Sequence, residues 1–85
     1  MKIEIKQTVW VVVQRWNIDY YDCDVAVFDT LDKAELFAET EAKAIAENEI
    51  KGGEIRHAGD GTIIVDYDDG GTDWWEATVE KKEVY

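Results

Sequence analysis

The chain has 85 residues, of which 20 are Asp or Glu and 9 are Lys or Arg, so its formal net charge at pH 7 is −11. This length predicts one domain, 1–85, with a thin core, since chains divide into domains only at greater length. A hydrophobic content of 46%, with four tryptophans, excludes a disordered acidic tail. The charge repels nucleic acid and anionic membranes, so neither is expected to bind directly.

The first third of the chain predicts a hairpin. Residues 8–16 and 23–29 are rich in Val and aromatic residues, which favour strands, and 17–22 have the composition of a loop. Residues 1–7 either add an edge strand or hang free.

Thr30 predicts the start of a helix over 31–48, because its hydroxyl can accept a hydrogen bond from the first helical turn. The residues expected to be buried recur at helical spacing: Ala34, Phe37, Ala38, Ala42 and Ile45. The glycines at 52 and 53 end the helix.

The rest of the chain predicts a short strand at 54–57 and firmer strands at 62–67 and 73–81, with a turn at 68–71. Residues 82–85 either extend the last strand or fray. Consecutive hairpins favour an antiparallel sheet, and one helix can cover one face of it. The predicted fold class is therefore α+β, a two-layer sandwich with four to five antiparallel strands.

Side-chain alternation divides the expected sheet into two faces. The face beneath the helix is expected to hold the apolar set Val9, Val11, Val13, Val25, Val27, Ile63, Val65, Trp75, Ala77 and Val79. The opposite face mixes aromatic, polar and acidic residues: Trp10, Val12, Gln14, Trp16, Asp24, Ala26, Phe28, Ile64, Asp66, Trp74, Glu76 and Thr78. Its large side chains either shield one another across strands or form a surface for a partner or a second copy.

Carboxylates gather in three groups. The first hairpin carries Asp19, Asp22 and Asp24; the helix carries Asp32, Glu35, Glu39 and Glu47; and the last hairpin carries Asp66, Asp68, Asp69, Asp73 and Glu76. Carboxylates one helical turn apart, or two residues apart on a strand, are separated by roughly 5–7 Å. Such rows can engage the Lys and Arg side chains that hold phosphates. A solvated acidic face without a partner is the alternative interpretation.

No catalytic or cofactor motif is present. The chain contains no serine, and Cys23 and His57 lack the context of a thiolate pair. Residues 59–61 are a turn that no lysine or helix start follows, so they do not predict a phosphate loop. We therefore expect a protein that is not an enzyme and holds no cofactor.

Residues 66–77 partly match a calcium loop. Asp66, Asp68 and Gly71 stand at its first, third and sixth positions, but Ala77 stands at the twelfth, where the pattern requires Glu. An acidic hairpin turn explains the same residues. No metal site is predicted, and weak binding of a divalent cation stays open.

Three stretches carry a resemblance: 9–13, 27–35 and 75–81. In them the chain resembles small, acidic, uncharacterised proteins of bacteria and mobile elements, of strand-strand-helix-strand-strand type. The resemblance implies a fold and carries over no functional residue. In size, acidity and lack of catalytic residues the chain is also similar to phage-encoded anti-CRISPR inhibitors.

These observations predict an acidic inhibitor that occupies the basic groove of a nucleic-acid-binding host protein, such as a CRISPR effector. The expected contacts are the carboxylates Asp66, Asp68, Asp69, Asp73, Glu76, Asp19, Asp22, Asp24, Glu35 and Glu39, with Trp74, Trp16 and Tyr20 as apolar anchors. The alternative is an interaction module or homodimer that uses a sheet face bearing Trp10, Trp16 and Trp74. The lone Cys23 and the charged N-terminus favour a cytoplasmic location.

Overall fold

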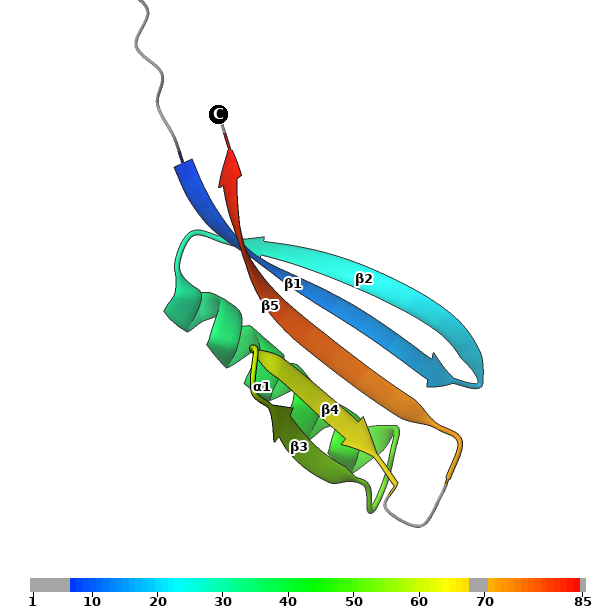
Figure 1. Cartoon of the computed structure of the whole chain (residues 1–85). Coiled ribbons are helices and arrows are strands. Elements are labelled where there is room, and N and C mark those ends of the chain that lie inside the picture. Colours follow the sequence, from blue (N-terminus) through cyan, green and yellow to red (C-terminus); the bar gives the residue numbers. More distant parts are fainter. Residues whose placement is uncertain (1–6, 68–70, 85) are drawn as a thin grey trace, which may run out of the picture.

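The computed structural model of the protein describes residues 7–67 and 71–84. Its elements in chain order are β1 (Gln7–Ile18), β2 (Tyr20–Phe28), α1 (Leu31–Asn48), β3 (Glu54–Ala58), β4 (Thr62–Asp66) and β5 (Trp74–Val84). The strands form one antiparallel sheet in the order β2-β1-β5-β4-β3, and α1 packs on one face of it (Figure 1). The predicted α+β sandwich is confirmed.

The β1–β2 hairpin is tighter than the sequence predicted. The expected loop over 17–22 is wrong, because both strands continue until Asp19 alone joins Ile18 to Tyr20. Asp19 has φ 68°, a left-handed conformation that Asp tolerates better than most residues. At the other end of the sheet β5 continues to Val84, which pairs with Gln7, so residues 82–84 extend the strand.

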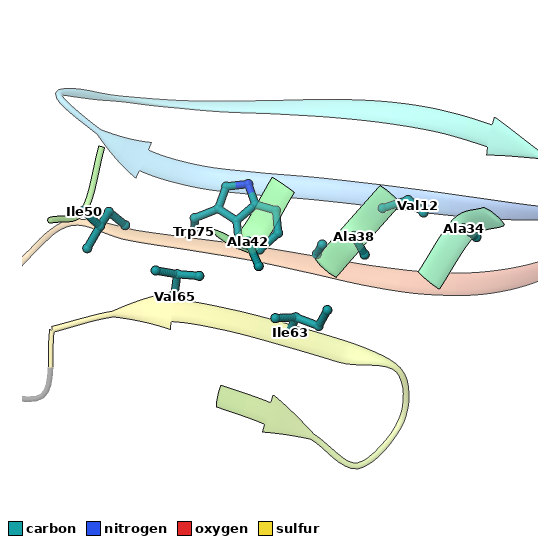
Figure 2. Close-up of a cluster of buried hydrophobic side chains, with 9 residues drawn as sticks. Val12, Ala34, Ala38, Ala42, Ile50, Ile63, Val65 and Trp75 are labelled. Atoms are coloured by element: carbon teal, nitrogen blue, oxygen red, sulfur yellow. The ribbon is translucent and has the colours of Figure 1, made fainter. Parts of the chain in front are cut away.

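Helix α1 begins as predicted. The Thr30 hydroxyl accepts a hydrogen bond from the Lys33 N–H at 3.2 Å. Three alanines one turn apart, Ala34, Ala38 and Ala42, are fully buried against the sheet, and their small side chains allow the helix to lie close to it (Figure 2). Within the described residues no helix is long and apolar enough to cross a membrane.

The chain leaves the helix through Ile50, which is buried and which the sequence did not single out. Its N–H donates to the Ile45 carbonyl at 2.8 Å, and its own carbonyl accepts from the Gly53 N–H at 2.9 Å. A Cβ at Gly53 would lie 2.6 Å from the Ile50 Cγ2 atom. Only glycine therefore fits at this position without a shift of the chain.

The predicted faces are right for β4 and β5 and wrong for β1 and β2. Ile63, Val65, Trp75 and Ala77 are buried beneath the helix, as expected (Figure 2). In the first hairpin the residues on the helix side are instead Trp10, Val12, Gln14, Trp16, Ala26 and Phe28, and Val9, Val11, Val13, Val25 and Val27 lie on the open face.

The reason for the inversion is that both faces of β1 are apolar, so alternation alone does not choose between them. Register decides: Gln14 pairs with Ala77 and Trp16 pairs with Trp75, which places both β1 residues on the helix side. Burying aromatic rings removes more apolar area from water than burying valines, which favours this choice.

Candidate functional site

A cleft of about 640 Å³ lies between the β1–β2 hairpin and the C-terminal half of α1. The hairpin contributes Gln14, Trp16, Ile18, Asp19, Tyr20 and Asp24 to its walls; the helix and its C-cap contribute Phe37, Glu41, Ile45 and Glu49; and β5 contributes Trp75. We call this feature the acidic cleft. It joins four of the predicted site residues, Trp16, Tyr20, Asp19 and Asp24; the sequence grouped Asp19 with Asp24 on the first hairpin but did not place α1 beside them.

The helix side of the acidic cleft is a single stripe. Phe37, Glu41, Ile45 and Glu49 recur at intervals of four residues, which places them one above another on the same face. Apolar and acidic side chains alternate along this stripe. Sequence reasoning missed Glu41 and Glu49, and their spacing from Phe37 and Ile45 is the signal that could have found them.

The apolar part of the cleft is fixed by aromatic contacts. Trp75 is fully buried, and its indole Nε1–H donates to Gln14 Oε1 at 3.1 Å. The Phe37 ring lies 5.1 Å from the Phe28 ring, centroid to centroid, which ties α1 to β2. These contacts hold the cleft walls in place without involving its carboxylates.

The carboxylates of the acidic cleft are not neutralised by the protein. Among the described residues, no Lys, Arg or His forms an ion pair with Asp19, Asp24, Glu41 or Glu49. Among the described residues, Asp24 accepts one hydrogen bond, from the Val25 backbone N–H to its Oδ1 at 2.9 Å. The four side chains therefore concentrate negative charge beside an aromatic wall.

The acids of the last hairpin are in a different position. Asp66 accepts from the Arg56 guanidinium, and Glu76 pairs with Arg15 at 3.8 Å, both on the sheet face opposite the helix. Asp73 is half-buried just before β5, and Asp68 and Asp69 lie outside the described residues. The described residues of this hairpin therefore do not form a cluster of free carboxylates.

The predicted tryptophan surface is also divided. Trp10 and Trp16 lie on the helix side, whereas Trp74 lies on the open face, where its ring meets Tyr21 edge-on at 6.2 Å. The expectation of one sheet face bearing Trp10, Trp16 and Trp74 is wrong. Trp16 pairs with Trp75, so the even-numbered residues of β1 share a face with the odd-numbered residues of β5, and Trp74 lies on the other face.

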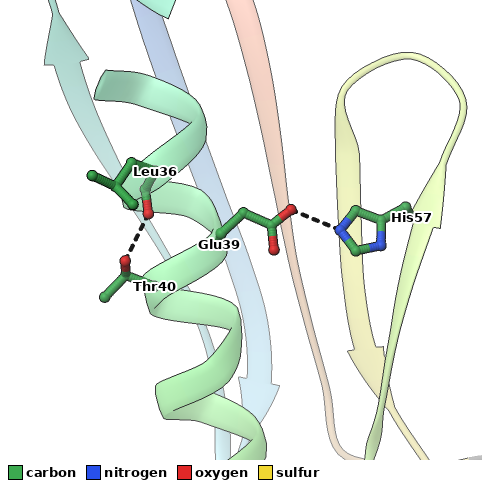
Figure 3. A network of polar contacts seen from close by, with 4 residues as sticks. All are labelled: Leu36, Glu39, Thr40 and His57. Carbon is green, nitrogen blue, oxygen red and sulfur yellow. Dashed lines mark hydrogen bonds and ion pairs between the residues drawn. The ribbon is translucent and has the colours of Figure 1, made fainter. Parts of the chain in front are cut away.

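A smaller groove, of about 380 Å³, lies on the other flank of α1, against the β3–β4 hairpin. The predicted residues Glu35 and Glu39 line it. Glu39 Oε1 lies 2.7 Å from His57 Nε2, and the hydroxyl of the neighbouring residue, Thr40, donates to the Leu36 carbonyl one turn earlier (Figure 3). Because Glu39 is engaged by His57, this groove holds fewer free carboxylates than the acidic cleft.

Two alternatives for chemistry find no geometric support. Cys23 lies on β2 and His57 on β3, which are opposite edges of the sheet, so the two cannot act as a pair. Among residues 7–67 and 71–84, no three His, Cys, Asp or Glu side chains are grouped to hold a metal ion. Asp66, the first residue of the calcium-like loop, is engaged by Arg56.

The side chains that line the acidic cleft are of the kinds that attract a cation. Carboxylates attract ammonium and guanidinium groups, and aromatic faces add cation–π attraction. Comparisons with protein-family models, with curated proteins and with solved structures find no match.

Proposed function

We propose that this chain is a binding protein whose acidic cleft receives a Lys or Arg side chain from the basic surface of a partner. The partner is a protein that binds nucleic acid through that surface, so the chain competes with the nucleic acid and inhibits it. The single observation that carries the proposal is one cleft that combines an aromatic wall with four carboxylates, none of which has a cationic partner among the described residues.

Arginine fits this cleft better than lysine. A guanidinium group is planar and stacks on aromatic rings, here those of Trp16 and Phe37, while its N–H groups reach carboxylates in pairs. Gln14 adds a donor to the cleft: its carbonyl oxygen accepts from Trp75, and no described residue accepts from its amide nitrogen. That nitrogen can donate to a backbone carbonyl of the basic segment.

The other acids of the helix strengthen this reading. Asp32 and Glu35 are exposed on the flank that faces away from the acidic cleft, and no described residue forms an ion pair with either. Charges of this kind increase the rate of encounter with an oppositely charged surface more than they increase affinity. High salt is therefore expected to slow association.

The general similarity to phage-encoded inhibitors makes a CRISPR effector the first partner to assay. We expect the chain to displace nucleic acid from such a protein in a competition assay. A labelled arginine-rich peptide is the simpler probe, because it isolates cation recognition from the rest of the partner.

The cleft can be tested by removing two charges without changing shape. Asp24→Asn with Glu49→Gln should weaken binding of the peptide by about tenfold or more, as for a central interface residue. Glu54→Gln with Asp60→Asn is the matched control: it removes the same charge from exposed positions outside the cleft. An equal loss in both pairs, or no displacement of nucleic acid by the wild type, would contradict the proposal.

A further inference from the structure

The open face of the sheet carries an apolar patch that the helix does not cover. It consists of Val9, Val11 and Val13 on β1 with Val25 and Val27 on β2, and we call it the valine patch. Val11 pairs with Val27 and Val13 with Val25, so the side chains are contiguous. Val25 and Val27 expose 55% and 62% of their surface, which is a large apolar exposure for neighbouring residues in a small domain.

The charges around the valine patch neutralise one another. On the same face Arg15 pairs with Glu76 at 3.8 Å, Lys82 pairs with Glu80 at 3.6 Å, and Arg56 pairs with Asp66. Glu54 is the remaining charged residue of the described strands on this face. The open face is therefore nearly neutral in a chain whose net charge is −11.

The charge distribution points to the occupant of this face. A basic partner finds its unpaired carboxylates at the acidic cleft, on the other side of the sheet, and an acidic partner is repelled by the whole chain. A second copy of the chain is repelled least when it approaches through the neutral face, because the two acidic helices then lie on the outside. An apolar centre with a paired polar rim is also the usual anatomy of a protein interface.

The edge of β2 is partly blocked against self-association by strand pairing. An exposed edge strand can pair with another chain through its free N–H groups. Here the Cys23 N–H donates to Asp22 Oδ1 at 2.8 Å, and the Val25 N–H donates to Asp24 Oδ1 at 2.9 Å. Two of the donors that an added strand needs are thus already occupied, and the flanking carboxylates repel a second acidic edge.

We infer that the chain forms a two-fold homodimer in which the valine patch packs face to face on the valine patch of a second copy. The two sheets then form a sandwich with about 10 Å between them. The acidic cleft stays open on the outer side of each copy, so the dimer does not depend on the proposed binding of a basic partner and does not prevent it.

Sedimentation equilibrium from about 1 to about 200 µM tests the dimer, because mass action populates it as concentration rises. We expect the wild type to be a dimer at the upper end. Val25→Lys with Val27→Lys should weaken dimerisation by about tenfold or more, since burying two ammonium groups is unfavourable. Both positions are exposed in the single copy, so circular dichroism should show an unchanged fold.

The matched control is Leu36→Lys with Ala44→Lys, which adds the same charge at exposed positions of α1. These lysines should not weaken dimerisation, because the helix lies outside the proposed interface. Both pairs lower the magnitude of the net charge, which by itself reduces repulsion between copies. Loss of the dimer in the strand variant alone therefore identifies the valine patch.

Salt separates this inference from the proposed function. Raising the salt concentration screens repulsion between two acidic copies and should strengthen the dimer, whereas it should weaken binding of the arginine-rich peptide. Three results would overturn the proposed dimer. The first is a wild type that stays monomeric at every concentration, the second is a dimer that survives both valine substitutions, and the third is assembly into species of increasing size. None of these outcomes bears on the peptide assay.

Discussion

Gln14 and Trp75 show how a single polar pair fixes the core of this protein. Gln14 is 6% exposed and Trp75 is fully buried, and the indole N–H of one donates to the carbonyl oxygen of the other at 3.1 Å. A buried donor without an acceptor costs free energy, whereas a satisfied pair costs little. The hydrogen bond is therefore the reason that glutamine is tolerated between Val12 and Trp16 on the helix side.

Gln14→Leu should lower the free energy of unfolding by about 1–3 kcal/mol, because it leaves the Trp75 N–H buried without an acceptor. The double variant Gln14→Leu, Trp75→Phe removes donor and acceptor together, so its loss should be smaller than the sum of the two single losses. Urea unfolding of the four proteins measures this coupling. Additive losses would show that the hydrogen bond contributes nothing.

The same residue explains why the faces of the first hairpin could not be predicted. A glutamine within an apolar strand predicts that its face is exposed to solvent, and the residue that satisfies it, Trp75, lies 61 positions away in the chain. The acids of the cleft were partly predictable: Asp19 and Asp24 stand out in the sequence, and the spacing of Glu41 and Glu49 puts them on one helix face. Only the docking of α1 beside the hairpin makes that face a wall of the cleft. Local sequence patterns describe a single element, whereas a cleft between two elements can be predicted only when their packing is known.

At the scale of elements, the sequence predicts the secondary structure of each segment better than its position in the fold. The Thr30 cap, the bounds of α1 and its buried alanine stripe are confirmed, because capping and helical spacing are local properties. The length of the β1–β2 hairpin was underestimated, since a turn made by Asp19 alone leaves no loop signature. The number and direction of the strands followed from the turns.

The start of α1 carries a pH-dependent contribution to stability. The Lys33 ammonium donates to Asp29 Oδ1 at 2.9 Å and lowers the pKa of that carboxyl below its ordinary value of 3.8. A lowered pKa means that the contribution is present above 3.8 and is lost as the pH falls through the folded-state value. This pair also places a negative charge next to the positive end of the helix.

Asp29→Asn should therefore reduce the melting temperature slightly at pH 7, and this deficit should shrink as the pH is lowered below 3.8 and the wild-type carboxyl takes up a proton. The pair is exposed, so the effect is small. Asp60→Asn, in the turn between β3 and β4, is the control with the same charge change and no ion pair among the described residues. A deficit of Asp29→Asn that persists in acid would assign the effect to something other than ionisation.

At the scale of the whole molecule, charge is distributed unevenly over the two layers. Among the described residues, the sheet face away from the helix pairs its three cations with acids, while the helix and the hairpin tip carry carboxylates without an ion pair on both flanks of α1. Composition alone gives the total of −11 and cannot show this separation. The separation follows from which strand face each charged residue occupies, and hence from the register of β1 on β5.

Such a distribution makes the fold itself sensitive to salt. Repulsion among carboxylates opposes compaction. Exposed ion pairs, such as Lys33 with Asp29 and Arg15 with Glu76, offset little of this repulsion. Raising NaCl from about 20 to about 300 mM shortens the Debye length and should raise the melting temperature by about 4 °C. The gain in melting temperature should be smaller for Glu35→Gln with Glu47→Gln, which removes two exposed helix carboxylates. A melting temperature that falls with salt would show that the ion pairs outweigh the repulsion. Measured at one low protein concentration, the change reports on the single chain and not on its association.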